Sequence, residues 1–175
     1  MQHSGNFRRR ATSVWIGAVL GLLLAVTLIT GQALAARAGT PALEIREESE
    51  AEAYLLQKIN EERLAEGREA LAVDPLLVRL AREKARDMAE RGYFDHVSPV
   101  LGTVFDMLRR EGVAYKWAGE NIARATSLVA AHQALMESPD HRANILSAGY
   151  TQVGVGVYRS GGKWHIAQIF MRPRA

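Results

Sequence analysis

The chain has 175 residues, with 22 Lys and Arg against 19 Asp and Glu, a sequence pI of about 9.4 and no cysteine. Residues 1–35 contain three Arg and no Lys, Asp or Glu. Subtracting these three from 22 leaves 19 basic residues against 19 acidic ones in the rest of the chain. The basic pI therefore arises from the N-terminus and gives no support to nucleic-acid binding, while the absence of cysteine excludes disulfides and thiolate chemistry.

The N-terminus has the pattern of an export signal. Arg8-Arg9-Arg10 precedes an uncharged apolar stretch that ends in the small-residue pattern Ala33-Leu34-Ala35. A basic segment, an apolar core and such a site are typical of a secretory signal peptide. The stretch is also close to the length that spans a bilayer, so residues 1–36 are either a signal peptide or a signal anchor. Both alternatives predict an extracytoplasmic protein that is secreted or held at the cell membrane by this segment alone.

The remaining chain divides into a short linker and one domain. Residues 37–48 contain Gly39 and Pro41 and have no sustained periodicity, which predicts a linker. Residues 49–175 have the usual size of a single domain with one apolar core.

Capping residues predict the first two helices of the domain. Ser49 and Glu52 have the spacing of a capping box, which predicts a helix that begins after Ser49 and ends near Gly67. The Asp74-Pro75 pair fits the N-cap and first position of a second helix, which ends at Gly92.

Three further helices are predicted before the last part of the chain. A short helix over 103–111 is followed by another over 126–137. Ser138 and Pro139 then fit the cap and first position of a new helix, because proline cannot continue the preceding one. The residues on either side of this break therefore belong to different helices.

From Thr151 onward the pattern has a period of two residues. Val153-Gly154-Val155-Gly156-Val157 alternates, Ser160-Gly161-Gly162 supplies a turn, and residues 164–171 are largely apolar on both faces. A strand that is apolar on both faces needs cover on both sides. The sequence therefore predicts an α+β sandwich with an antiparallel sheet between helical layers.

Four polar motifs lie next to predicted turns and helix starts, and together they place two His and two Glu where a cleft is expected. The motifs are Phe94-Asp95-His96-Val97-Ser98-Pro99, Gly119-Glu120-Asn121-Ile122-Ala123, Glu137-Ser138-Pro139-Asp140-His141-Arg142 and Gly154-Val155-Gly156-Val157.

This ordered set of motifs, within residues 53–171, resembles the bacterial, disulfide-free branch of the CAP superfamily. The superfamily, also called SCP-like, includes cysteine-rich secretory proteins, antigen five and pathogenesis-related proteins. The resemblance implies a three-layer α-β-α sandwich with a central antiparallel sheet and a cleft lined by His96, Glu120, Glu137 and His141. The chain differs from the usual bacterial pattern in having Leu135 where a Trp is common.

The same residues also have purely structural interpretations. His96 can bond to backbone in a turn, and Glu120 can satisfy buried amides. His132 and His165 fit packed or surface histidines better than ligands, and Ser98 fits a turn residue better than a nucleophile.

Three functions stay open from the sequence. Two neutral imidazoles can bind Zn²⁺, which predicts His96 and His141 as metal ligands, and no organic cofactor is expected. The first function is the binding of a cell-envelope ligand, a glycan, peptide or lipid. The second is metal-assisted hydrolysis of peptide or cell-wall bonds with Glu120 or Glu137 as the base, although the chain has no His-Glu-x-x-His motif. The third is a lipid or sterol carrier, by analogy of fold.

Overall fold

The computed structural model describes residues 40–174, with side chains from residue 47 onward. The predicted leader and the first residues of the predicted linker lie outside this range. Among the described residues, no helix combines the length and the apolar character that crossing a membrane requires.

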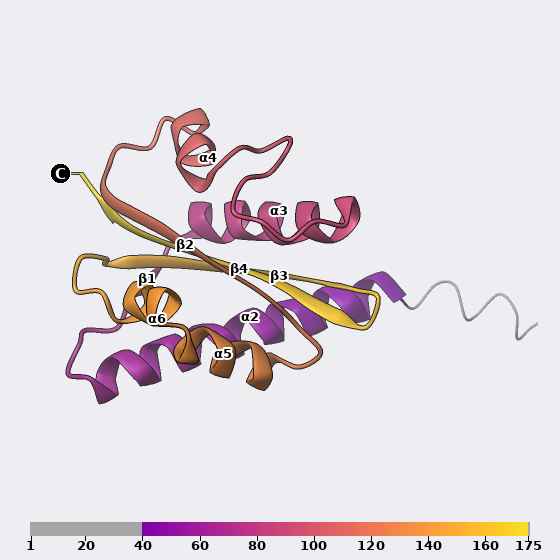
Figure 1. Cartoon of the computed structure of the whole chain (residues 1–175), viewed down its shortest axis with the longest axis horizontal. Helices are drawn as coiled ribbons and strands as arrows, with labels where there is room; N and C mark the ends of the chain where they lie inside the picture. Colours follow the sequence, from indigo (N-terminus) through magenta and orange to yellow (C-terminus); the bar gives the residue numbers. More distant parts are fainter. Residues whose placement is uncertain (1–39, 175) are drawn as a thin grey trace, which may run out of the picture. The chain divides into compact units, whose positions relative to one another are not determined.

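The described residues form five helices and a four-stranded sheet. The sheet has the strand order β1-β3-β4-β2. Helices α3 and α4 cover one face, and α2, α5 and α6 cover the other (Figure 1). The bounds are α2 Thr40–Ala65, β1 Ala72–Val73, α3 Pro75–Arg91, α4 Val104–Arg110, β2 Tyr115–Ala125, α5 Leu128–Glu137, α6 Pro139–Leu146, β3 Gln152–Ser160 and β4 Lys163–Pro173.

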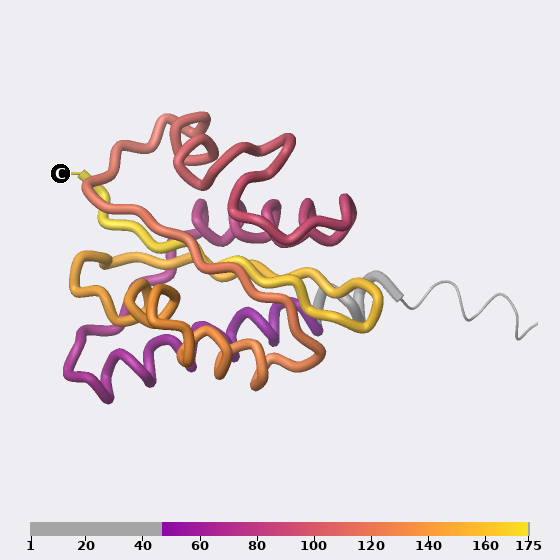
Figure 2. Tube along the Cα trace, viewed as in Figure 1, coloured from indigo at the N-terminus to yellow at the C-terminus, as the bar shows by residue number. Residues whose placement is uncertain are grey.

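This arrangement confirms the predicted α-β-α sandwich and refines its sheet. Strands β2 and β3 each pair antiparallel with β4, and β2 follows β4 along its length (Figure 2). The two-residue strand β1 pairs with β3 in parallel, so the sheet is mixed. The sequence predicted neither β1 nor β2.

Strand β4 lies at the centre of the core. Trp164, Ile166 and Phe170 face a buried cluster formed with α2, α5 and α6. Ile169 and Met171 face a second cluster, formed with α3 and α4. The apolar character of both faces of this strand thus corresponds to burial on both sides.

Most predicted helix boundaries are confirmed. The side chain of Asp74 accepts hydrogen bonds from the first turn of α3, and Gly92 ends this helix with φ of 72°. Thr103 and Asp106 form a capping box at the start of α4. Ser138 has the backbone position of the α6 cap, but its side chain makes no capping hydrogen bond.

The predicted start of the first helix is wrong. Helix α2 begins at Thr40, so Ser49 lies within it and residues 40–48 of the predicted linker are helical. Glutamate is a strong helix former, and Pro41 is tolerated because it falls in the first helical turn.

Candidate functional site

Three of the four predicted cleft residues come together at strand β2. His96 lies in the loop after α3, Glu120 in β2, and His141 in the first turn of α6. His96 Nδ1 is 2.7 Å from Glu120 Oε1. The rings of His96 and His141 have centroids 6.5 Å apart and an interplanar angle of 38°. Two imidazoles and one carboxylate therefore share one site.

Neighbouring residues of β2 connect the two sides of this site. The Glu120 side chain binds the ring of His96, and in a strand the next side chain points to the opposite face. Asn121 is fully buried on that face and donates from Nδ2 to the backbone carbonyl of His141, at 3.0 Å. Asn144 in turn donates to Asn121 Oδ1 at 2.9 Å. Glu120 thus holds the His96 ring and Asn121 holds the His141 backbone, from opposite faces of β2.

A buried lysine positions the loop that carries His96. Lys84 is fully buried on α3, and its ammonium donates to the backbone carbonyls of Asp95 at 2.7 Å and His96 at 2.9 Å. Ser98 donates to Asp87 at 2.6 Å and its hydroxyl accepts from the amide of Leu101. Ser98 is therefore engaged in the turn, as its sequence context predicts.

A buried arginine holds the other end of α6. Arg63 of α2 donates to the backbone carbonyls of Ile145 at 2.7 Å and Ser147 at 2.8 Å. The last carbonyls of a helix have no partner within it, so a buried end requires such donors. The sequence did not predict roles for Lys84 and Arg63. For Lys84 the available signal was a lysine on the apolar face of a helix, three residues after Ala81.

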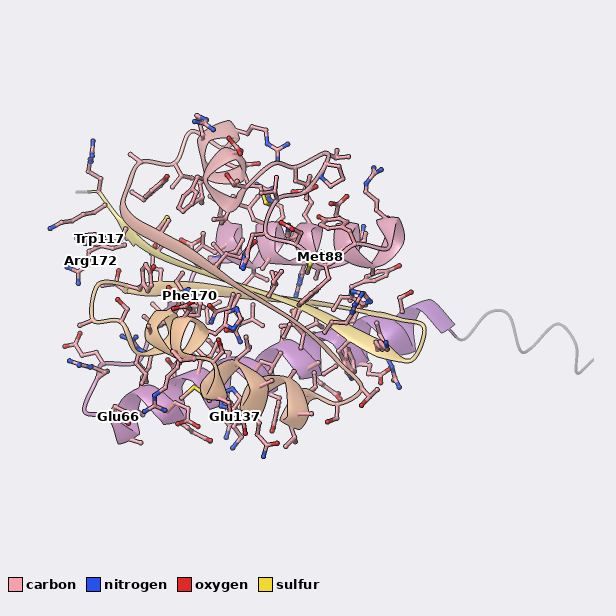
Figure 3. All side chains as sticks on the ribbon, in the orientation of Figure 1. Glu66, Met88, Trp117, Glu137, Phe170 and Arg172 are labelled. Carbon is pink, nitrogen blue, oxygen red and sulfur yellow. The ribbon has the colours of Figure 1, made fainter. Side chains whose placement is uncertain are left out.

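Glu137 lies apart from this group. It is exposed at the end of α5, and within the described residues no hydrogen bond or ion pair connects it to His96, Glu120 or His141. Figure 3 shows it on the α5 side, away from the sheet. Its place in the cleft stays a prediction.

Two further histidines, His132 and His165, were predicted to be packed or surface residues rather than ligands, and both are buried. His132 and His165 are each 7% exposed, and His132 lies 3.3 Å from Glu62.

The two histidines of the site have opposite pKa shifts. The hydrogen bond to Glu120 raises the pKa of His96 above its ordinary value of 6.5, although desolvation opposes this. Burial lowers the pKa of His141, and charge on His96 lowers it further. The sequence predicted a neutral His141 from the helix dipole, and the structure gives the same direction with burial as the main cause.

We expect Glu120→Gln to lower the pKa of His96, because the neutral amide no longer stabilises the imidazolium. Histidine-ring NMR of the metal-free protein measures this shift, and Glu62→Gln, next to His132, is the matched control that leaves His96 unchanged. An unaltered His96 pKa in Glu120→Gln would contradict the assigned contact. Since the folded-state pKa is raised, the pair stabilises the fold fully below about pH 6.5 and loses this contribution as pH rises through that pKa.

The described side chains offer a metal ion at this site two imidazoles at most and no set of three protein ligands. Among the side chains of residues 47–174, no group of three or more His, Asp or Glu is placed to bind one ion. The bond between His96 Nδ1 and Glu120 leaves Nε2 as the available ring nitrogen, which is the second-shell arrangement that orients a ligating histidine. A metal here would take its remaining ligands from solvent or from a bound molecule.

Comparison with known proteins identifies the family. Residues 56–171 match the CAP model, the cysteine-rich secretory protein family. The chain belongs to the CAP family. This CAP domain is 41% identical over 114 residues to the uncharacterized protein YkwD of Bacillus subtilis, covering 65% of this chain and 44% of that protein. It is 36% identical over 109 residues to the uncharacterized membrane protein YlbC of the same organism, covering 62% and 32%.

A solved structure has the same fold. An extracellular protein containing an SCP domain from Bacillus anthracis aligns with a TM-score of 0.70 and 35% identity, covering 76% of this chain and 44% of that one. The CAP chain thus spans less than half the length of these relatives.

Proposed function

We propose that this CAP domain is an extracytoplasmic binding module that takes up a cell-envelope ligand at His96, Glu120 and His141, with a divalent metal as an optional modulator. One observation carries the proposal: Glu120 holds the His96 ring at 2.7 Å, and the ring of His141 faces the same site with its centroid 6.5 Å away. The His96 side chain is 53% exposed, so a ligand can reach this ring from solvent. The secretory pattern of the N-terminus and the extracellular relative support the location.

A hydrolase is the second candidate. The hydrogen bond between Glu120 and His96 favours a hydrolase, because metal-ligating histidines commonly donate their second ring nitrogen to a carboxylate. Two observations favour binding instead. The described residues supply no third metal ligand, and Ser98 is committed to Asp87 and the turn rather than free as a nucleophile.

A lipid carrier has weaker support. A groove of about 240 Å³ lies between α2, α3 and β3, with Leu56, Val78 and Val155 in its lining. This volume is below the roughly 300–1,000 Å³ of typical small-molecule sites. The site at His96 is therefore the preferred one.

Co-sedimentation with insoluble peptidoglycan tests the proposal. We expect the chain to sediment with the wall material and to release no soluble fragments, and we expect His96→Ala/His141→Ala to stay in the supernatant. His132→Ala is the matched control, because this buried histidine lies next to Glu62 and not at the site of His96 and His141.

The other outcomes are equally informative. The chain could instead release soluble fragments, and Glu120→Gln could stop this release while still sedimenting. That result would favour the hydrolase over the binding module. Absence of sedimentation, or sedimentation unchanged in the double variant, would contradict the binding of wall glycan or peptide by these histidines.

A further inference from the structure

A second pocket lies at the end of the sheet where β2 begins and β4 ends. It has a volume of about 750 Å³ and is lined by Lys116, Thr151, Arg172, Pro173 and Arg174. We call it the basic pocket, because three of its five lining residues are cationic and none is acidic. The exposed Trp117 is the cross-strand neighbour of Arg172, and both lie at this end of the molecule (Figure 3).

The backbone brings these cations together. Strand β2 has an irregularity between Tyr115 and Trp117, where Lys116 has no register partner on β4. Such a bulge redirects a side chain, and here Lys116 lines the same pocket as Arg172 and Arg174. The amide of Arg174 donates to the carbonyl of Ala114 at 3.0 Å, which extends the pairing beyond the strand and fixes the backbone of Arg174.

Within the described residues, none of the three cations forms an ion pair. No ion pair joins Lys116, Arg172 or Arg174 to a carboxylate within residues 47–174, although several other cations of the domain are paired. Arg172 Nε is buried without a hydrogen-bond partner, and a terminal nitrogen of the same guanidinium reaches only the Ala148 carbonyl, at 3.5 Å. The sequence after residue 35 is formally neutral, so this concentration of positive charge is local.

The charge and donor geometry point to the ligand chemistry. A guanidinium presents parallel N–H donors that match the oxygens of phosphate or carboxylate. A carboxylate offers two acceptor oxygens and one charge, whereas a phosphate group surrounds its phosphorus with more acceptor oxygens and carries up to about two charges when it is free or a monoester and one when it is a diester. Three unpaired cations around one pocket therefore match phosphate better than carboxylate.

We propose that the basic pocket of Lys116, Arg172 and Arg174 binds a phosphate group, either of a free phosphate compound or of a lipid headgroup. The pocket is distinct from the histidine site. Lys116 precedes Glu120 by four residues of an extended strand, which is a separation of about 13 Å at roughly 3.3 Å per residue. The proposal does not depend on the function of the histidines.

Calorimetric titration of the full chain in a neutral detergent tests this site with three probes. Inorganic phosphate represents a free phosphate, glycerophosphoglycerol represents the headgroup diester of a lipid, and acetate represents a carboxylate. Lys116→Gln/Arg174→Gln removes two exposed cations and leaves the partly buried Arg172 and the sheet intact. Lys163→Gln/Arg86→Gln is the control, since it removes the same charge from residues that do not line the pocket.

We expect saturable binding of at least one phosphate probe, weakened about tenfold or more in Lys116→Gln/Arg174→Gln and unchanged in the control. Tighter binding of the diester would indicate a lipid headgroup as the source, and tighter binding of inorganic phosphate a free compound. Absence of saturable binding, equal binding in the pocket variant, or acetate binding as tight as phosphate would overturn the proposal.

Discussion

Phe170→Ala is expected to lower the free energy of unfolding by about 3–5 kcal/mol. Phe170 is fully buried in the central strand β4, and its ring stacks on Tyr150 with centroids 5.5 Å apart. Cross-strand neighbours from β2 and β3 flank it, so the surrounding backbone has little freedom to close the resulting cavity.

Urea denaturation measures this loss, with Phe105→Ala as the matched control. Phe105 is 46% exposed, and its truncation should cost much less. Equal decreases in the free energy of unfolding of the two variants would contradict the placement of Phe170 in the core.

Gly156→Ala is expected to lower the free energy of unfolding by about 3 kcal/mol, the upper end of the usual cost of overpacking a core. Strand β3 crosses α3 at this residue, and a Cβ there would come closer than 3.0 Å to backbone atoms of Ala81 and Arg82. Helix backbone cannot move aside as a flexible side chain can, so the layer of α3 must separate from the sheet. Gly154 meets the same helix one turn earlier, at Leu77.

Gly161→Ala separates this effect from the ordinary cost of replacing a glycine. Gly161 has φ of 57°, and a Cβ at this position would have no neighbouring atom within 4 Å, so its substitution meets only the conformational cost of about 1–2 kcal/mol. Thermal or urea unfolding of both variants gives the comparison. A smaller loss in Gly156→Ala than in Gly161→Ala would contradict the close approach of helix and strand.

Local signals predicted the elements that have local causes. Asp74 before Pro75, glycine after α3 and the alternation of β3 act within a few residues, and the structure confirms all three. The apolar character of β4 on both faces also predicted the layers, because burial on two sides requires cover on two sides.

The elements that were missed depend on distant partners. In strand β2, the polar residues Glu120 and Asn121 interrupt the alternating apolar pattern that indicates a strand. Their side chains can be buried because His96 and Asn144, from distant parts of the chain, form hydrogen bonds with them. Strand β1 is two residues long and exists through its pairing with β3. Neither has a pattern of its own that sequence reasoning can detect.

In the candidate site, too, some residues were predictable from local motifs and others were not. The motifs identified His96, Glu120 and His141, and the structure brings these three together. The roles of Lys84 and Arg63 were not foreseeable, because each becomes clear only when a carbonyl from another segment is placed beside it. Buried cations that donate to loop carbonyls require tertiary structure to be recognised.

Calorimetric titration of Zn²⁺ into the metal-free chain tests most directly whether His96 and His141 act as one binding site. We predict one Zn²⁺ per chain at a pH where both imidazoles are neutral, with binding abolished in His96→Ala/His141→Ala and retained in His132→Ala. Absence of binding, or binding unchanged in the double variant, would contradict a shared site at these two histidines.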